Sequence, residues 1–453
     1  MAKFKPIKLM PHQKKTLKKR GETSILLDLS EPGTGKSVAH ATHFVKHRQA
    51  GGGAGLIVAP LSLIDTVWPH EIGLVNPDVD VSVAFATNRA KAFQPGHDIY
   101  VTNYNGLEYL SENPSLMRKL GIDWFLGDEA TAFKNPQAKR TKRCHKLVRN
   151  VEFKALLSGS LGAKMITDYF APTLILDDGK RLGWQFSRFR EATCYPVQVG
   201  RQAHMIQWEP REGADLAVAQ LLQDISIRHL FATTVKQSIR TIEFKLPPKL
   251  RKLYEQMARE QAMFLKDKVI TAANGGAAAQ KLLQIASGST YDNQKANTLL
   301  DMQRYELVAD LAEEREKTLI AFQWHHQREA LELLLKKRGR TTAYIDGTVP
   351  GEKRKAIVEA HKRGEIDDLL LQPQAAAHGL TLVNARTTIW ATPTYDYELF
   401  DQLNRRTYRT GQSQDCEVIV ICAENTLDAK AFEVCTTKGK RMMTMFEYIR
   451  DFT

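Results

Sequence analysis

Ten short apolar runs divide this chain into two halves that repeat one pattern. Five lie in each half, at residues 24–29, 55–60, 98–103, 123–128 and 155–160, and at residues 317–322, 341–346, 367–372, 387–392 and 417–424. Runs this short, apolar throughout and separated by helix-like stretches, are typical of strands buried on both faces of a parallel sheet. Helical patterns at residues 327–338 and 351–363 make the predicted fold class α/β.

A chain of 453 residues is too long for one ordinary core and predicts two or three domains. We expect an N-terminal domain at residues 1–235 with a helical, aromatic insertion at about 165–230. A C-terminal domain at residues 236–453 would hold a second helical insertion at about 249–315. Within that insertion, Gly275-Gly276 in a bland stretch predicts an exposed turn or mobile loop.

The charge balance, 64 Lys+Arg against 51 Asp+Glu, gives +13 and favours polyanionic partners, nucleic acid first. Many basic proteins nevertheless bind no nucleic acid. The five cysteines form no CxxC pair and no His/Cys cluster, so neither a disulfide framework nor a zinc site is indicated. The start lacks the apolar core of a secretion signal and no run could span a bilayer, which predicts a soluble intracellular protein.

Residues 31–37, Glu-Pro-Gly-Thr-Gly-Lys-Ser, lie between a predicted strand and a predicted helix, which is the context of a P-loop. Glycines there let backbone N–H groups approach phosphates, and the helix N-terminus favours negative charge. Lys36 would contact the β- and γ-phosphates, and the Ser37 hydroxyl would ligate Mg²⁺. Ser30 replaces a glycine of the general pattern. The alternative is a glycine turn that only caps a helix.

Asp128 and Glu129 stand at the end of the apolar run at residues 123–128. Such strand ends are where α/β proteins bind ligands. Asp128 could hold Mg²⁺ through its water shell, and Glu129 could orient or deprotonate an attacking water. Alone, an Asp-Glu pair after a strand is more often a solvated loop. Together with the P-loop it indicates nucleotide hydrolysis.

Arg406 and Arg409 stand three residues apart, one helical turn, between Gln402 and Gln412. Guanidinium groups stabilise charge that develops on a transferring γ-phosphoryl group, so both are candidate arginine fingers. The alternative is an exposed helix whose arginines form surface ion pairs of little energetic value. Upstream of the P-loop, the Gln13 amide both donates and accepts, which matches the edge of adenine.

In their order along the chain, these residues resemble the motifs of helicase superfamily two, and within it the Snf-type (Swi/Snf-like) translocases. The resemblance covers nearly the whole chain, and residues 402–412, Gln…Arg…Arg…Gly-Gln, are its most specific element. The compact chain resembles bacterial or bacteriophage members. The remaining similar segments are residues 9–13, 31–37, 55–72, 101–104, 128–131, 158–160, 184–189, 246–249, 318–322, 346–347 with Arg354, and 374–382. The resemblance implies two RecA-like lobes with parallel sheets and a helical insertion in each.

The roles of the family's site residues carry over onto matching positions as expectations. Catalytic roles fall on Lys36, Asp128, Glu129, Arg406 and Arg409. ATP-binding roles fall on Gln13, Gly33, Thr34, Gly35, Lys36, Ser37 and Gly379. DNA-binding roles fall on Ser62, Thr102, Tyr104, Ser160 and Gln374. The implied cofactors are ATP and Mg²⁺, with Ser37 and Asp128 as the metal ligands.

Some positions depart from the family pattern. Thr131 replaces a histidine and Leu161 a proline, Ala376 and Ala377 replace glycines, and Thr381 replaces an asparagine. These departures leave the phosphate chemistry intact. They fall in segments that couple hydrolysis to DNA in the family, so the coupling is expected to differ.

The resemblance implies an ATP-driven translocase on double-stranded DNA, whose work could be remodelling of DNA-bound proteins, fork reversal or branch migration. One alternative is a strand-separating DNA or RNA helicase that uses an aromatic loop such as residues 186–189. Another is a nucleotide-switched DNA-binding scaffold with weak hydrolysis. The expected partner is DNA, double-stranded or branched, and no association with a membrane is expected. The expected location is the cytoplasm of a bacterial or phage-infected cell, in association with DNA.

Overall fold

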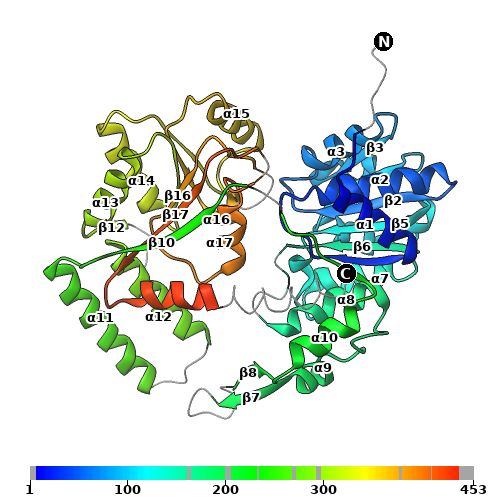
Figure 1. Cartoon of the computed structure of the whole chain (residues 1–453). Helices are drawn as coiled ribbons and strands as arrows, with labels where there is room; N and C mark the ends of the chain where they lie inside the picture. The colour runs from blue at the N-terminus through cyan, green and yellow to red at the C-terminus, as the bar shows by residue number, and fades with distance from the viewer. Residues whose placement is uncertain are drawn as a thin grey trace. The chain divides into compact units, whose positions relative to one another are not determined.

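A computed structural model describes residues 7–159, 161, 165–198, 206–231, 234–267, 272–291, 297–376, 380–409 and 411–437. The chain divides into two compact units, with the boundary between Ala232 and Thr233. Each unit is built on its own parallel sheet (Figure 1). Among the described residues, no helix is both long and apolar enough to cross a membrane.

The first unit contains a seven-stranded sheet in the order β3-β4-β2-β5-β6-β1-β9, and all its strand pairs are parallel. The five runs predicted in this half are confirmed as strands. Two further strands, β3 and β9, were not predicted. The strands are β1 (Ile25–Asp28), β2 (Ala54–Ala59), β3 (Val81–Ala84), β4 (Ile99–Asn103), β5 (Ile122–Asp128), β6 (Phe153–Leu157) and β9 (Ser226–Ile227).

The longer helices of the first unit are α1 (Pro11–Glu22), α2 (Lys36–Gln49), α3 (Val67–Val75), α5 (Gly106–Glu112), α7 (Lys139–Val148), α8 (Phe170–Asp177), α9 (Phe186–Thr193) and α10 (Ala214–Leu222). One face of the sheet packs on α2 and α3, because Phe44 and Trp68 share a core cluster with the central strands. Residues two apart in a strand point to the same face, so Ile57 and Ala59 both join that cluster.

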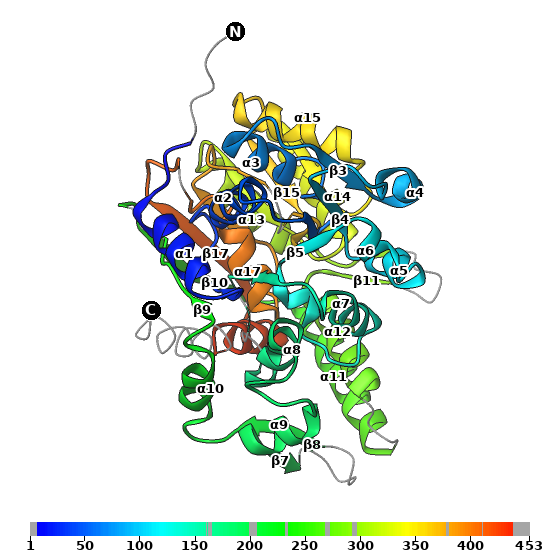
Figure 2. The ribbon, with the colours of Figure 1, turned by 90° about the vertical axis from the view of Figure 1, so that its right-hand side faces the viewer.

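The insertion expected at residues 165–230 contains α8, α9 and α10, but it is not purely helical. It also forms an antiparallel hairpin of β7 (Cys194–Gln198) and β8 (Ile206–Pro210). Its last residues form β9, which pairs with β1 in the main sheet. The hairpin and α9 lie at the end of the unit opposite α3 and β3 (Figure 2).

The second unit contains a six-stranded sheet in the order β10-β17-β16-β13-β15-β14, again with parallel pairs only. The five runs predicted here are confirmed, and β10 was not predicted. The strands are β10 (Gln237–Phe244), β13 (Thr318–Ala321), β14 (Thr342–Ile345), β15 (Asp368–Leu371), β16 (Thr387–Trp390) and β17 (Cys416–Ala423). The helices that follow the insertion are α14 (His325–Lys337), α15 (Gly351–Lys362), α16 (Pro373–Ala376) and α17 (Tyr397–Asn404).

The insertion of the second unit is mainly helical, as expected, with α11 (Pro248–Asp267), α12 (Ala272–Ala286) and α13 (Gln303–Glu313). A short hairpin of β11 (Ser289–Tyr291) and β12 (Asn297–Leu299) lies between α12 and α13. The turn predicted at Gly275-Gly276 was wrong, because both glycines lie inside α12. Alanine neighbours on both sides favour the helix, and they offset a cost of about 1 kcal/mol for each glycine.

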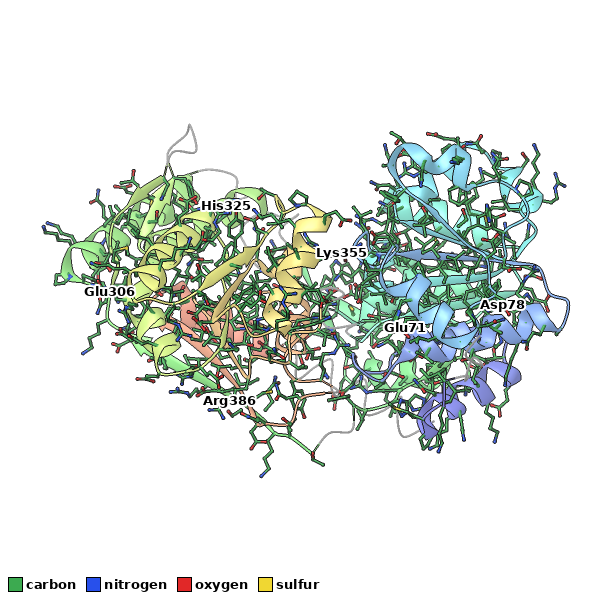
Figure 3. The ribbon with its side chains drawn as sticks, turned by 90° about the horizontal axis from the view of Figure 1, so that it is seen from above. Glu71, Asp78, Glu306, His325, Lys355 and Arg386 are labelled. Carbon is green, nitrogen blue, oxygen red and sulfur yellow. The ribbon has the colours of Figure 1, made fainter. Side chains whose placement is uncertain are left out.

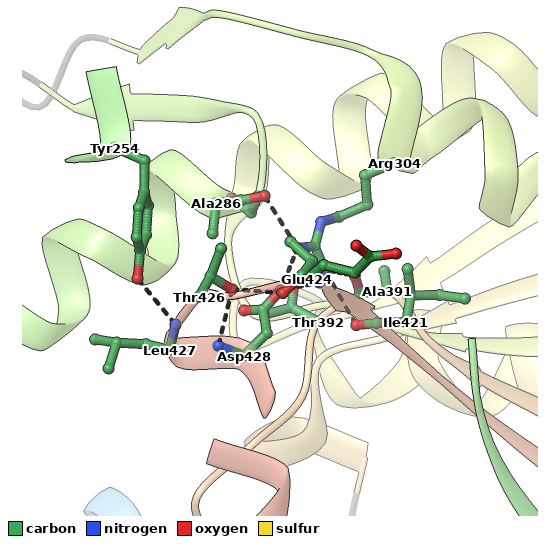
Figure 4. A network of polar contacts seen from close by, with 12 residues as sticks. Tyr254, Ala286, Arg304, Ala391, Thr392, Ile421, Glu424, Thr426, Leu427 and Asp428 are labelled. Atoms are coloured by element: carbon green, nitrogen blue, oxygen red, sulfur yellow. Dashed lines mark hydrogen bonds and ion pairs between the residues drawn. The ribbon is translucent and has the colours of Figure 1, made fainter. Parts of the chain in front are cut away.

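A buried arginine ties this insertion to the sheet (Figure 4). The Arg304 guanidinium, on α13, donates to the carbonyl oxygens of Ala286 at 3.0 Å and Ala391 at 2.8 Å, and it pairs with the Asp428 carboxylate. Both charged groups are fully buried. Arg304 therefore joins the end of α12 to the segment after β16 and to the chain beyond β17.

Candidate active site

The phosphate-loop segment and the paired acids of the first unit meet at one edge of its sheet. Strand β6 lies between β1 and β5, and Leu157 pairs in register with both Asp28 and Asp128. Because the strands are parallel, the segments that leave their carboxyl ends emerge together. The sheet thus gathers the loop after β1, the acids at the end of β5 and Ser158 after β6.

The loop after β1 has the backbone shape that a phosphate cradle requires. Gly33 and Gly35 have φ values of 88° and 69°, a region that glycine adopts without strain. A Cβ atom on Gly35 would come within 2.5 Å of Gln13 Nε2, so a side chain at Gly35 would displace the Gln13 amide from the loop. Lys36 and Ser37 begin α2, as the P-loop pattern predicts. These residues fit a nucleotide phosphate.

The Lys36 side chain reaches back to the first residues of this loop. Its ammonium group donates to the carbonyl oxygens of Ser30 at 2.5 Å and Glu31 at 3.2 Å. The buried Asp28 carboxylate, at the end of β1, accepts from His40 Nε2 at 3.1 Å and from Ser30 N at 2.9 Å. Burial alone would raise the pKa of Asp28, but the His40 hydrogen bond and charge, with the Lys36 charge, lower it to about 2. An ionised carboxylate therefore lies behind the loop.

The Asp28–His40 pair was missed by sequence reasoning. An aspartate that closes an apolar run looks like a strand end, and a histidine in the next helix looks like a surface residue. Burial lowers the pKa of His40, although the hydrogen bond to Asp28 and the Asp28 charge act against this shift. The only sequence signal is the spacing of twelve residues, which places the two on consecutive elements.

Gln13, near the start of α1, contacts the loop directly. Its Oε1 accepts from Met10 N at 2.8 Å, and its Nε2 donates to the Gly35 carbonyl at 3.0 Å. The side chain is buried. An amide group has two N–H donors and two lone pairs on its oxygen, so one donor and one acceptor position remain after these bonds.

Asp128 is held by side chains from two other elements. The indole N–H of Trp68, on α3, donates to Asp128 Oδ2 at 3.0 Å, and the Tyr104 hydroxyl donates to the Asp128 carbonyl at 2.9 Å. Glu71, which is labelled in Figure 3, lies on α3 one turn beyond Trp68. Burial raises the pKa of Asp128, although the Trp68 hydrogen bond, the Lys36 charge and the Glu129 N–H lower it. Carboxylate and hydroxyl oxygens suit Mg²⁺, so Asp128 and Ser37 fit a magnesium site.

Glu129 has a strained backbone and a held side chain. Its φ of 61° lies in the left-handed region, which costs a non-glycine residue on the order of 1–3 kcal/mol. Its Oε1 accepts from the Ser158 hydroxyl at 3.1 Å and from the Thr131 hydroxyl at 3.3 Å. Thr131, which replaces the family's histidine, thus takes part in orienting Glu129. Such strain persists where surrounding contacts fix the residue.

In the second unit, both candidate arginine fingers converge on one carbonyl. Arg406 Nη1 and Arg409 Nη1 donate to the Leu380 oxygen at 3.2 Å and 3.0 Å. The expected helical turn was wrong, because α17 ends at Asn404 and the two arginines lie in the turn that follows. Nor is Arg406 a surface residue, since it is buried and its Nε donates to the Gln402 carbonyl.

The expected DNA-binding residues lie in different environments. Ser62 follows β2 in a half-buried turn, and Gln374 is exposed on α16. Tyr104 packs edge-on against Phe133. Thr102 is fully buried in β4, where its hydroxyl donates to the Ala84 carbonyl at 2.6 Å. Its side chain therefore stabilises the interior of the unit and is not exposed for a contact with DNA. Ser160 and Gly379 lie outside the described residues.

The aromatic loop suggested at residues 186–189 is instead the first turn of α9. Phe189 is buried, and both Phe186 and Phe189 pack against Phe170. These rings belong to the core of the insertion. They do not form a free wedge that could separate strands.

Comparison with known proteins identifies two family domains along the chain. Residues 12–306 match the SNF2-related domain, and residues 297–411 match the helicase conserved C-terminal domain. Protein p41 of Acyrthosiphon pisum secondary endosymbiont phage 1 is 27% identical over 407 residues, which cover 83% of this chain and 84% of p41. YwqA of Bacillus subtilis (strain 168), whose name describes an ATP-dependent helicase/translocase, is 23% identical over 91% of this chain. That match spans 45% of YwqA, less than half of its length.

Among solved structures, the Sulfolobus solfataricus SWI2/SNF2 ATPase core in complex with double-stranded DNA is similar, with 18% identity and a TM-score of 0.43 over 97% of this chain and 95% of that one. The family match covers well over half of the chain and contains the P-loop and the paired acids. The chain therefore belongs to the SNF2-related family of helicase superfamily two and is a DNA-dependent ATP hydrolase.

Proposed function

We propose that this protein is a motor that uses ATP hydrolysis to move along double-stranded DNA without separating its strands. The observation that carries the proposal is the arrangement around Glu129, whose carboxylate is held by Ser158 and Thr131 beside the Asp128 carboxylate. A base held in this way is suited to activating a water molecule. A protein that used ATP only as a switch would have little need of it.

The proposed division of labour follows from the chemistry of each group. The backbone of residues 33–35 and the Lys36 ammonium would bind phosphate, and Ser37 and Asp128 would hold Mg²⁺, which would neutralise charge on the phosphates. Glu129 accepts the proton of the attacking water. Arg406 and Arg409 are proposed to stabilise the charge that develops on the transferring group.

Binding to DNA is supported by the composition, and the preference for duplex DNA follows the resemblance to the Snf-type translocases. A net charge of +13 favours contacts with phosphates, which are largely independent of sequence. Ser62, Tyr104 and Gln374 are proposed to contact the DNA backbone. The packing of Phe186 and Phe189 against Phe170 argues against the aromatic wedge that a strand-separating helicase could use there.

The test is ATPase stimulation by duplex, forked, four-way and single-stranded DNA and by RNA. We expect duplex DNA to stimulate hydrolysis, and a higher rate with four-way DNA would indicate branch migration. Stimulation by single strands alone would favour a helicase. No hydrolysis with any nucleic acid would favour a nucleotide-switched scaffold.

A variant separates hydrolysis from binding. Glu129→Gln should reduce turnover about a hundredfold or more, because the base is lost, and should leave ATP binding intact. Glu112→Gln, an exposed change on α5 in the same unit, is the matched control and should retain full activity. Unchanged turnover in Glu129→Gln would remove Glu129 from the mechanism.

A further inference from the structure

The first half of the phosphate loop is bonded to the segment through which the chain leaves the first unit. We call residues 228–231, which follow β9 and precede the unit boundary, the exit segment. Strands β1 and β9 pair in parallel, and the pairing continues past their ends. Leu29 N donates to the Ile227 carbonyl at 2.8 Å, and Glu31 N donates to the His229 carbonyl at 2.9 Å. The loop backbone is thus an extension of the sheet.

Side chains strengthen this attachment. Glu31, the first residue of the P-loop motif, accepts from Arg228 Nη2 at 3.2 Å and from Phe231 N at 3.0 Å through its two carboxylate oxygens. Arg228 Nη1 also lies 3.4 Å from the Leu29 carbonyl. The Arg228 side chain is 2% exposed and that of Glu31 is 12% exposed. A pair this shielded from water is screened far less than a surface ion pair.

The contact made by the Ser30 hydroxyl gives a structural reason for serine where the general pattern has glycine. Its hydroxyl oxygen accepts from His229 N at 3.0 Å. Glycine at this position would leave that N–H without its acceptor. His229 is in turn held by Thr16 of α1, whose hydroxyl lies 2.9 Å from His229 Nε2. The exit segment therefore contacts both the loop and α1, the helix that carries Gln13.

We propose that Arg228 and Ser30 are positioning residues that make ATP affinity depend on the conformation of the exit segment. The inference rests on the proposed function, since it requires the loop to bind the phosphates of ATP. Movement of the exit segment must break its bonds to Ser30 and Glu31, and those bonds hold the loop in its binding shape. Linkage is reciprocal, so ATP that stabilises the loop must also stabilise the exit segment.

Steady-state kinetics with saturating duplex DNA test the first half of this proposal. Arg228→Gln should raise the KM for ATP about tenfold, with a much smaller change in kcat, because a charged hydrogen bond to the loop is lost. Arg228→Lys keeps the charge and should recover part of the loss. Ser30→Gly should raise the KM less. Arg181→Gln is the matched control, because Arg181 pairs with Asp224 near β9 without contacting the loop.

Hydrogen exchange tests the second half. The amides of His229 and Phe231 donate to Ser30 and Glu31, so ATP should slow their exchange in the wild-type protein. In Ser30→Gly this protection at His229 should be lost. If Arg228→Gln does not fold, Arg228→Lys and Ser30→Gly decide the matter.

Two results would overturn the inference, and they differ in what they say of the proposed function. If ATP binds the wild type and Lys36→Ala abolishes that binding, while the Arg228 and Ser30 variants keep the wild-type KM and exchange pattern, only the positioning role fails. If the wild type binds no ATP, the proposed function fails and the inference fails with it.

Discussion

At the scale of single residues, the site depends on groups that support the catalytic candidates. Trp68 holds the Asp128 carboxylate, and Ser158 with Thr131 holds Glu129. Trp68 and Ser158 are 60 and 29 residues from the residue that each of them holds, whereas Thr131 is only 2 residues from Glu129. Burial raises the pKa of Asp128, while the hydrogen bond from Trp68, the Lys36 charge and the Glu129 N–H lower it. Of these three, the hydrogen bond from Trp68 lowers the pKa most.

This hydrogen bond predicts a pH effect for Trp68→Phe. In the proposed site Asp128 must be ionised to hold Mg²⁺, so ATPase activity should be lost as pH falls through the pKa of Asp128. The Trp68 N–H favours the ionised form, so its removal raises that pKa and moves the acid limb of the pH–rate profile to higher pH. At neutral pH the loss should be about fivefold, the value of one hydrogen bond. The measurement is the ATPase rate against pH.

Trp184→Phe is the control for this change, because Trp184 is more than half exposed and lies in the insertion, away from Asp128. It should leave the acid limb in place. A folded Trp68→Phe protein with an unshifted acid limb would show that the indole does not tune Asp128.

At the scale of elements, the second insertion is attached to its sheet by a buried polar contact as well as by apolar packing. Arg304 on α13 bonds to the carbonyl of the last residue of α12 and to that of the residue after β16, and it pairs with Asp428 (Figure 4). Around it, Tyr305 and Val308 of the same helix pack into the core cluster of the unit. The insertion is thus part of the unit's core. It is not an independent module.

Arg304→Gln should lower the free energy of unfolding by about 3–5 kcal/mol, because it leaves the Asp428 carboxylate buried without its cation. Thermal or denaturant unfolding measures the loss. Arg363→Gln is the control, since Arg363 pairs with Glu365 on the surface of the same unit, where water screens the pair, and this change should leave the free energy of unfolding nearly unchanged. Equal stability of the two variants would contradict the role given to Arg304.

At the scale of the whole molecule, the excess of positive charge should set the response to salt. Phosphate contacts release counterions, so the duplex-stimulated part of the ATPase rate, measured at subsaturating DNA, should fall steeply between about 50 and 200 mM salt. The DNA-independent rate should change much less, because the contacts around Glu129 and Asp128 are partly buried. Titration of both rates with salt measures this. Equal salt dependence would argue against a phosphate-based DNA contact.

Much of this molecule could be predicted locally. The ten apolar runs became strands, since a strand buried on both faces needs a continuous apolar segment that is visible in the sequence. Local patterns failed where packing overrode them, as at Gly275-Gly276 inside α12 and at Arg406 beyond the end of α17. Strand β9, only two residues long, has no local signal. It exists because β1 offers it a partner.

The fold class and the family were predictable from the sequence, as was a proposed chemistry for the loop, because each rests on contiguous residues such as Lys36-Ser37 and Asp128-Glu129. The tertiary structure alone decided which groups support them. Trp68 and Asp128 are 60 residues apart, and Glu31 and Arg228 are 197 apart. Hydrogen bonds between such distant residues depend on how the strands are ordered in the sheet and where their ends meet. No local pattern encodes that order.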